Sequence, residues 1–203
     1  MDARCKESYS FFLDTVKNDL SEFIDNMDYA EIEAAADLIL EAQKNGGRVH
    51  VSGIGKPGHI SGYIASLMSS TGNPTYFLHG TEAVHGSCGQ LVPGDVVIFI
   101  SNSGETAEMR STVLAVKNNG CKVIGVSGNR DSWLAKESEV HLFAGVKKEG
   151  GPLGRAPRMS ILAETLLLQA LSVALQADKD VTPQQYVKWH PGGALGKLRD
   201  DEK

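Results

Sequence analysis

The sequence predicts a doubly wound α/β fold, in which a five-stranded parallel sheet is flanked by helices and preceded by N-terminal helices. Three observations support this fold. The chain has 203 residues, 41% hydrophobic and 22% charged, which is the usage of an ordinary globular domain. From residue 48 onward, short apolar runs alternate with stretches of helical periodicity. The 22 glycines gather in the loops between these segments, which indicates backbone used for ligand contact.

Residues 1–46 are predicted to form a helical extension packed on a single domain of residues 47–203. Between Ser8 and Ala42, apolar residues recur at three- and four-residue spacing in two segments, as in helices with one buried face. Asp28 and Glu31 have the spacing of a capping box at the start of the second helix.

Five strands and three further helices follow. The strand candidates are short apolar runs, and the helix candidates carry apolar residues at helical spacing. The strands are predicted at Val49–Val51, Thr75–Leu78, Val96–Ile100, Val123–Val126 and Val140–Phe143, and the helices near Pro57–Ser70, Glu105–Asn118 and Met159–Gln176. Ligands of such a sheet bind where the strands end, so the loops after the strands are the first candidates for a site.

Composition excludes several classes of protein. A net charge of −5 argues against a nucleic-acid surface, which needs a basic face. The three cysteines fit neither a disulfide framework nor a metal hook, which favours a reduced, cytoplasmic protein. The most apolar segment, Ile161–Leu175, is interrupted by Glu164 and Gln169, so no membrane span is expected.

The loop after the first strand contains three glycines in a GxGxxG pattern. A dinucleotide site would also need an acidic residue at the end of the next strand, and none stands there. A P-loop would need Ser or Thr where Pro57 stands. We therefore predict a loop that brings Ser52, Gly53 and Gly55 close to a ligand, with Lys56 as a point charge. A plain turn with a solvated lysine is the alternative.

Residues 101–106, the serine loop, connect a buried strand to a helix. Hydroxyl and amide donors at such a place suit a phosphate, because a helix N-terminus adds unpaired N–H groups. The candidate phosphate-binding residues are Ser101, Asn102, Ser103 and Thr106. The alternative is that one hydroxyl merely caps the helix. Glu105 would repel a phosphate, so we expect it to face the sugar or to act as a base.

Two further residues could transfer protons. Glu149 lies in a glycine-rich loop where packing requires no carboxylate, and His190 lies in a segment rich in Pro and Gly near the C-terminus. Taken alone, each is more often a surface residue than a catalyst. His50 and His141 lie within apolar strand runs and are expected to be structural.

These segments together resemble the sugar isomerase (SIS) domain, and within it the arabinose-5-phosphate isomerases. The resemblance covers roughly Val49 to Leu198. The matched stretches are GIGKPGH at 53–59, SSTG at 69–72, EAVHG at 82–86, ISNSGE at 100–105, KEGGPLG at 148–154 and HPGGALG at 190–196.

The resemblance implies that Lys56, Glu105, Glu149 and His190 form the catalytic set and that the serine loop holds the sugar phosphate. It places His85 near the substrate, where adventitious zinc could inhibit, but it implies no required metal and no cofactor. It also implies a homotetramer, in line with apolar helix faces that exceed what one small sheet can cover. His190 could then complete the site of a neighbouring subunit.

The function predicted from these residues is interconversion of an aldose phosphate and a ketose phosphate, D-arabinose 5-phosphate and D-ribulose 5-phosphate, through an enediol. Glu149 would be the base, His190 would assist ring opening or proton exchange, and Lys56 would stabilise oxyanion charge. Two alternatives stay open: a sugar-phosphate sensor without turnover, and an isomerase or lyase of another sugar phosphate, including an amino-sugar phosphate.

The chain departs from the family in two places. Arg155 and Arg158 stand in a segment where the family usually has small hydroxyl residues, which leaves the identity of the sugar open. Many members carry a pair of regulatory CBS domains after the SIS domain. This chain ends at Lys203, so we expect no regulation of that kind.

Overall fold

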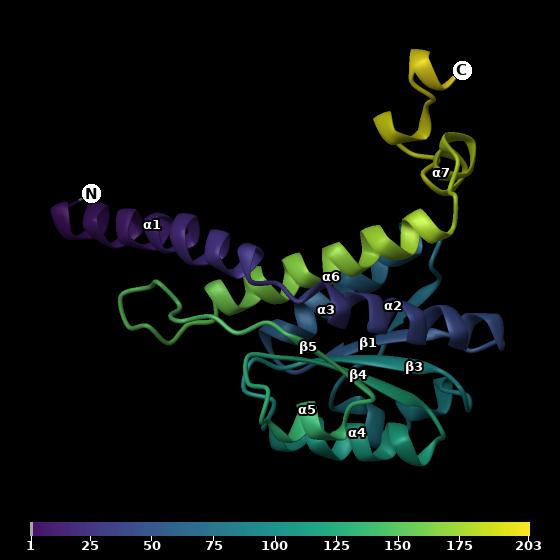
Figure 1. The fold of residues 1–203 in the computed structure, drawn as a ribbon, viewed down its shortest axis with the longest axis horizontal. Coiled ribbons are helices and arrows are strands. Elements are labelled where there is room, and N and C mark those ends of the chain that lie inside the picture. The colour runs from purple at the N-terminus through teal and green to yellow at the C-terminus, as the bar shows by residue number, and fades with distance from the viewer. Residues whose placement is uncertain (1) are drawn as a thin grey trace.

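The computed structural model describes residues 2–203 as a three-layer α/β/α arrangement (Figure 1). The helices are α1 (Ala3–Asp25), α2 (Tyr29–Lys44), α3 (Lys56–Ser70), α4 (Ala107–Asn118), α5 (Trp133–Glu137), α6 (Met159–Asp178) and α7 (Pro183–Trp189). The strands are β1 (Val49–Gly53), β2 (Thr75–Phe77), β3 (Val96–Ile100), β4 (Lys122–Ser127) and β5 (Val140–Phe143). Short 3₁₀ helices occur as η1 (Glu82–His85), η2 (Ser87–Gln90), η3 (Ala194–Gly196) and η4 (Asp200–Glu202).

The five strands form one parallel sheet in the order β2-β1-β3-β4-β5. After β1 the chain forms β2 on one side of it and then crosses back to form β3 on the other side, so the sheet is doubly wound about the β1/β3 boundary. The predicted fold class is confirmed, and all five predicted strands are present.

Each face of the sheet has its own core, because successive side chains of a strand point to opposite faces. Val96, Ile98 and Ile100 of β3 belong to the cluster beneath α2, α3 and α6, whereas Val97 and Phe99 belong to the cluster over α4 and α5. Figure 1 shows α1, α2, α3 and α6 on one side of the sheet and α4 and α5 on the other.

Three local predictions need correction. Asp28 caps α2 by accepting a hydrogen bond from Ala30 N at 3.0 Å, but Glu31 does not complete the capping box. Its carboxylate instead accepts from Phe143 N at 2.8 Å and pairs with Arg130, so a bond to β5 replaces the local one. The helix predicted from Glu105 begins only at Ala107, and helices α5 and α7 were not predicted.

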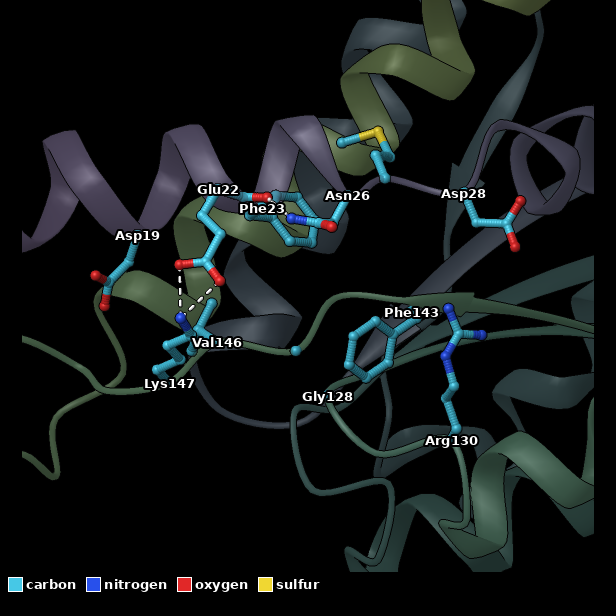
Figure 2. Close-up of a pocket in the computed structure, with 12 residues that line it drawn as sticks. Asp19, Glu22, Phe23, Asn26, Asp28, Gly128, Arg130, Phe143, Val146 and Lys147 are labelled. Carbon is cyan, nitrogen blue, oxygen red and sulfur yellow. Dashed lines mark hydrogen bonds and ion pairs between the residues drawn. The ribbon is translucent and has the colours of Figure 1, made fainter.

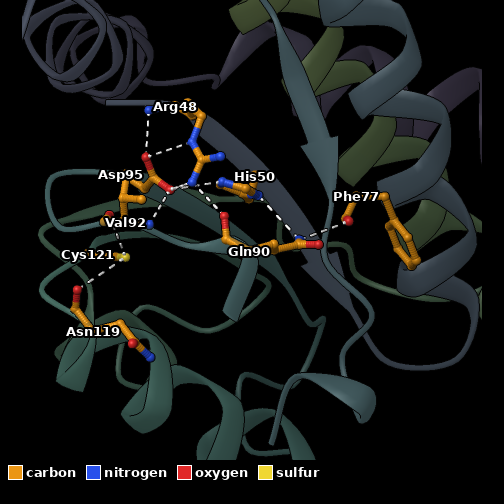
Figure 3. A network of polar contacts seen from close by, with 8 residues as sticks. All are labelled: Arg48, His50, Phe77, Gln90, Val92, Asp95, Asn119 and Cys121. Carbon is orange, nitrogen blue, oxygen red and sulfur yellow. Dashed lines mark hydrogen bonds and ion pairs between the residues drawn. The ribbon is translucent and has the colours of Figure 1, made fainter. Parts of the chain in front are cut away.

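Both strand histidines are structural, as predicted. His50 is buried on β1, with Nε2 3.1 Å from Asp95 Oδ2 (Figure 3). Asp95 Oδ2 also accepts a hydrogen bond from Arg48 Nη2 at 2.8 Å. Desolvation lowers the pKa of His50, although Asp95 opposes the shift. His141 Nε2 lies 2.8 Å from Ser127 Oγ.

Within residues 2–203, α6 alone has the length and apolar composition of a membrane span, but half of that stretch is buried inside the protein. A core helix has the same composition, and α6 packs on α2 and α3. Cys5, Cys88 and Cys121 are all free thiols.

Candidate active site

The loops that follow β1 and β3 enclose a cavity at the carboxyl edge of the sheet. Gly53, the last residue of β1, lies opposite Ile100, the last residue of β3, so the two loops leave the sheet side by side. The cavity has a volume of about 270 Å³ and is lined by Ile54, Pro57, Ser101, Asn102, Ser103, Thr106 and Met109. All four candidate phosphate-binding residues of the serine loop therefore face one cavity at the topological switch point.

Internal hydrogen bonds shape the serine loop. Ser101 Oγ accepts from Gly104 N at 3.2 Å and lies 3.3 Å from Thr106 Oγ1, while Ser103 Oγ accepts from Glu105 N at 3.2 Å. No side chain of the described residues caps the N-terminus of α4. The capping alternative is therefore wrong, and the first N–H groups of α4 stay available to an anion.

The first glycine loop is packed tightly. A Cβ on Gly53 would lie 2.8 Å from the carbonyl carbon of Pro57, so this glycine lets β1 and α3 approach each other. Gly55 has φ +67° and forms the N-cap of α3. Lys56 begins the helix with an exposed side chain beside the cavity-lining Pro57. Ser52 is fully buried at the end of β1, and its hydroxyl has no hydrogen-bond partner among the described residues.

Glu105 is held by protein groups outside the cavity. Its Oε1 accepts from Trp133 N at 2.8 Å, and its Oε2 forms an ion pair with Arg110. The Arg110 guanidinium in turn lies over the Trp133 ring, 5.3 Å from its centroid. The carboxylate thus connects the serine loop to the start of α5 and does not line the cavity.

Glu149 sits at the N-terminus of the long helix α6. Its Oε2 accepts from Arg158 N at 2.6 Å and from Ser160 N at 3.2 Å. These donors and the positive end of the helix stabilise negative charge on the carboxylate. Helix α1 covers the loop, since a Cβ on Gly150 would lie 3.1 Å from the Phe12 ring.

His190 forms the C-cap of α7. Its Nδ1 lies 2.8 Å from the Tyr186 carbonyl oxygen, and its ring stacks on the Tyr186 ring with centroids 3.9 Å apart. Because a carbonyl oxygen can only accept, Nδ1 carries the hydrogen and Nε2 of the neutral ring is left to accept a proton.

His190 and Lys56 lie at opposite edges of the sheet within one chain. The Trp189 ring packs on Gly72, 3.1 Å from where a Cβ would lie, and Gly72 comes just after Thr71, the C-cap of α3. Lys56 is the first residue of this 15-residue helix, so the two ends are roughly 22 Å apart at about 1.5 Å per residue. In Figure 1 the C-terminal segment leaves α6 at the end opposite the loop that carries Glu149.

His85 is exposed at the end of η1. The nearby His79 does not point to a metal, because its Nδ1 accepts from Thr81 N at 3.3 Å and from Glu82 N at 3.2 Å. In the described part of the chain, no group of three or more His, Cys, Asp or Glu side chains could hold a metal ion.

A second cavity, of about 380 Å³, lies at the carboxyl ends of β4 and β5 beside α1 (Figure 2). Its two cations are already neutralised. Lys147 Nζ lies 2.6 Å from both carboxylate oxygens of Glu22, and Arg130, paired with Glu31, stacks 4.5 Å over the Phe143 ring. Of these two cavities, the one at the serine loop combines hydroxyl-bearing side chains in its lining with a helix N-terminus that no side chain of the described residues caps.

The SIS domain model matches residues 42–174, well over half of the chain. The chain belongs to the SIS domain family. The arabinose 5-phosphate isomerase KdsD of Shigella flexneri is 42% identical over 151 residues, which are 74% of this chain and 46% of that protein. KdsD of Pseudomonas aeruginosa is 42% identical over 163 residues, 80% of this chain and 49% of that protein. The SIS chain thus spans about half the length of the curated relatives it matches.

Among solved structures, an Escherichia coli CFT073 protein in complex with arabinose 5-phosphate superposes with a TM-score of 0.83 at 34% identity. The superposition covers 94% of this SIS chain and 100% of that chain. The shared fold therefore includes the N-terminal helices as well as the sheet.

One buried carboxyl group near Glu149 is not among the site residues predicted from the sequence. Glu164 of α6 is fully buried, and the sequence shows it only as an interruption of an apolar segment. A carboxylate in the most apolar helix of the chain is the signal that could have singled it out.

Proposed function

We propose that this protein is an aldose–ketose isomerase that interconverts D-arabinose 5-phosphate and D-ribulose 5-phosphate through an enediol intermediate. The observation that carries the proposal is the cavity between β1 and β3, where Ser101, Asn102, Ser103 and Thr106 meet an uncapped helix N-terminus. The relatives named arabinose 5-phosphate isomerase and the related structure with bound arabinose 5-phosphate support this choice of sugar.

The serine loop would hold the phosphate of the open-chain sugar, with the N–H groups of α4 directed at it. Glu149 would take the proton beside the carbonyl and return it to the neighbouring carbon. Lys56 would stabilise the oxyanion of the enediol, and His190 would open the sugar ring through its free Nε2. Glu105, held by Trp133 and Arg110, would orient the serine loop.

The active site would be completed by a second copy of the chain. One chain holds Lys56 and His190 at opposite ends of α3, so they can meet at one substrate only across a subunit boundary. Helix α1 also leaves Tyr9, Phe11 and Leu13 exposed, at 47, 51 and 58% of their surface. We propose a homotetramer in the cytoplasm.

The first experiment is proton NMR in D2O with the chelator-treated protein and each pentose phosphate in turn. Interconversion with deuterium at C2 of arabinose 5-phosphate and at C1 of ribulose 5-phosphate is the expected result, because the proton carried between these two carbons exchanges with solvent. Binding of either sugar phosphate in a thermal-shift assay without turnover would contradict the proposal and favour the sensor.

Subunit mixing tests the shared site. The variants Lys56→Ala and His190→Ala should each be inactive, and refolding the two together should restore a fraction of the activity, because mixed oligomers contain some intact sites. If mixing restores nothing while both variants remain oligomeric in light scattering, the two residues do not act at one shared site.

A further inference from the structure

Glu164 carries a fully buried carboxyl group, one helical turn after Ser160, whose N–H donates a hydrogen bond to Glu149. Glu164 has no exposed surface, and neither of its carboxylate oxygens has a hydrogen-bond partner among residues 2–203. A buried carboxyl without a partner destabilises a protein, and an apolar residue would fill the same place without that cost. Packing therefore gives no reason for a glutamate here.

The geometry of α6 directs this carboxyl toward Glu149. Ser160 and Glu164 are four residues apart, so they share one face of the helix. Side chains of a helix tilt toward its N-terminus, which brings the Glu164 carboxyl toward the turn of Ser160. Ser160 N donates to Glu149 Oε2 at 3.2 Å, and the buried Ser160 Oγ itself has no partner among the described residues.

The helices packed against this carboxyl bury few polar groups. Helix α6 packs on α1, α2 and α3, and α1 and α2 each have one buried polar atom without a partner among the described residues, Asp19 Oδ2 and Gln43 Oε1. The side chains that the three helices bury fully are apolar except for Thr15 and Ser61. Both hydroxyls already donate to backbone carbonyls of their own helices. Burial raises the pKa of Glu164 to about 8, and Glu149 adds to the shift as the single charged group that acts on it within residues 2–203.

We propose that Glu164 is a positioning residue that acts through Glu149: the two carboxyl groups share one negative charge, which rests on Glu149 while Glu164 keeps the proton. This inference depends on the role of Glu149 in the proposed function. The N–H groups of Arg158 and Ser160 favour the charge on Glu149, and the apolar surroundings favour the proton on Glu164. When Glu164 loses its proton at alkaline pH, its charge strengthens Glu149 as a base.

The activity test compares the wild type with Glu164→Gln, which keeps the size and polarity but cannot ionise. In the wild type, kcat should rise by roughly threefold to tenfold through an ionisation between about pH 7 and 9, and KM should not change. In Glu164→Gln that rise should be absent. The control Glu33→Gln changes an exposed glutamate of α2 and should behave as the wild type. The same pH profile in Glu164→Gln and the wild type would overturn the proposal.

A second measurement does not depend on turnover. With glutamate labelled at the carboxyl carbon, NMR follows the titration of Glu164, assigned by the signal missing in Glu164→Gln. Its midpoint should lie near pH 8 in the wild type and fall by on the order of one pH unit in Glu149→Gln, because one negative charge is removed. An equal midpoint in both proteins would overturn the coupling. If the wild type turns over neither sugar, the isomerase proposal fails, and this titration still decides the coupling.

Discussion

The two edges of the sheet use polar residues in opposite ways. At the amino edge, the buried Asp95 accepts hydrogen bonds from Arg48 N at 2.8 Å, from Val92 N at 2.9 Å and from the Arg48 side chain, and it pairs with His50 (Figure 3). At the carboxyl edge, Ser101 and Thr106 bond to each other beside an open cavity, and the N-terminus of α4 has no side-chain cap among the described residues.

The comparison shows how to separate structure from function among polar groups of one fold. Burial would raise the pKa of Asp95, but hydrogen bonds from Arg48 and Val92 N outweigh it and lower that pKa. A carboxylate satisfied in this way holds strands in register and has little capacity left for a ligand. N–H groups without a side-chain partner, as at the N-terminus of α4 behind the serine loop, are available to a substrate.

Glu149 provides the largest expected contrast. Its change to Gln keeps an oxygen that can accept from Arg158 N and Ser160 N, so Tm should change little. The amide cannot take a proton from carbon, so kcat should fall by about 10²- to 10⁴-fold. Steady-state kinetics and thermal unfolding measure the two effects, with Glu33→Gln as the control. A variant with the kcat of the wild type would remove Glu149 from the chemistry.

Asp95→Asn should have the opposite profile. The change leaves the buried His50 and the Arg48 guanidinium without their anion, and the free energy of unfolding should fall by roughly 2–4 kcal/mol. The kcat of the protein that remains folded should stay within about twofold of the wild type. Urea unfolding and kinetics below the transition test both statements. A loss of kcat without a loss of stability would show that the amino edge also controls the site.

Glu164 does not follow this contrast between the two edges of the sheet. It is buried without hydrogen-bond partners among the described residues, yet it lies near the loop that carries Glu149 and not in the open cavity. Its folded-state pKa of about 8 lies above the ordinary 4.5, so between these values the folded protein holds a proton that the unfolded chain has released. Stability should therefore fall as pH rises from about 4.5 to about 8. Relative to Glu164→Gln, the loss at pH 8 should be on the order of 4 kcal/mol. Urea unfolding at pH 5, 6.5 and 8 measures it; a constant difference across this range would contradict the prediction.

The local sequence pattern was sufficient to predict a strand that is buried on both faces, because such a strand is a continuous apolar run, as in Val96–Ile100. The local pattern failed where a residue distant in sequence competes for a hydrogen bond. Glu31 has the spacing of a capping box, but Phe143 N and Arg130 take its carboxylate. The short helices α5 and α7, of 5 and 7 residues, are stabilised mainly by caps and by contacts that periodicity does not reveal.

The candidate site was predictable in its residue types and its edge of the sheet, because parallel strands bring their following loops together. Side-chain directions were not predictable. The N–H of Trp133 and the guanidinium of Arg110 direct Glu105 away from the cavity, and both come from other elements. The position of the C-terminal segment, which follows α6 and carries His190, depends on the direction in which α6 crosses the sheet, a property of the tertiary fold (Figure 1).

Glu105→Gln gives the smallest and most discriminating effect. Its ion pair with Arg110 is exposed, at 45 and 41% of the two side chains, so losing the charge should cost less than about 1 kcal/mol of stability. The Gln oxygen can still accept from Trp133 N, so the serine loop should keep its shape and kcat should fall by less than about tenfold. Kinetics beside Glu149→Gln then separate the two glutamates. A fall in kcat beyond about 10²-fold with unchanged stability would make Glu105 the base. Glu105 would then be one of the groups that contact the substrate, although its carboxylate is paired with Arg110 in this structure.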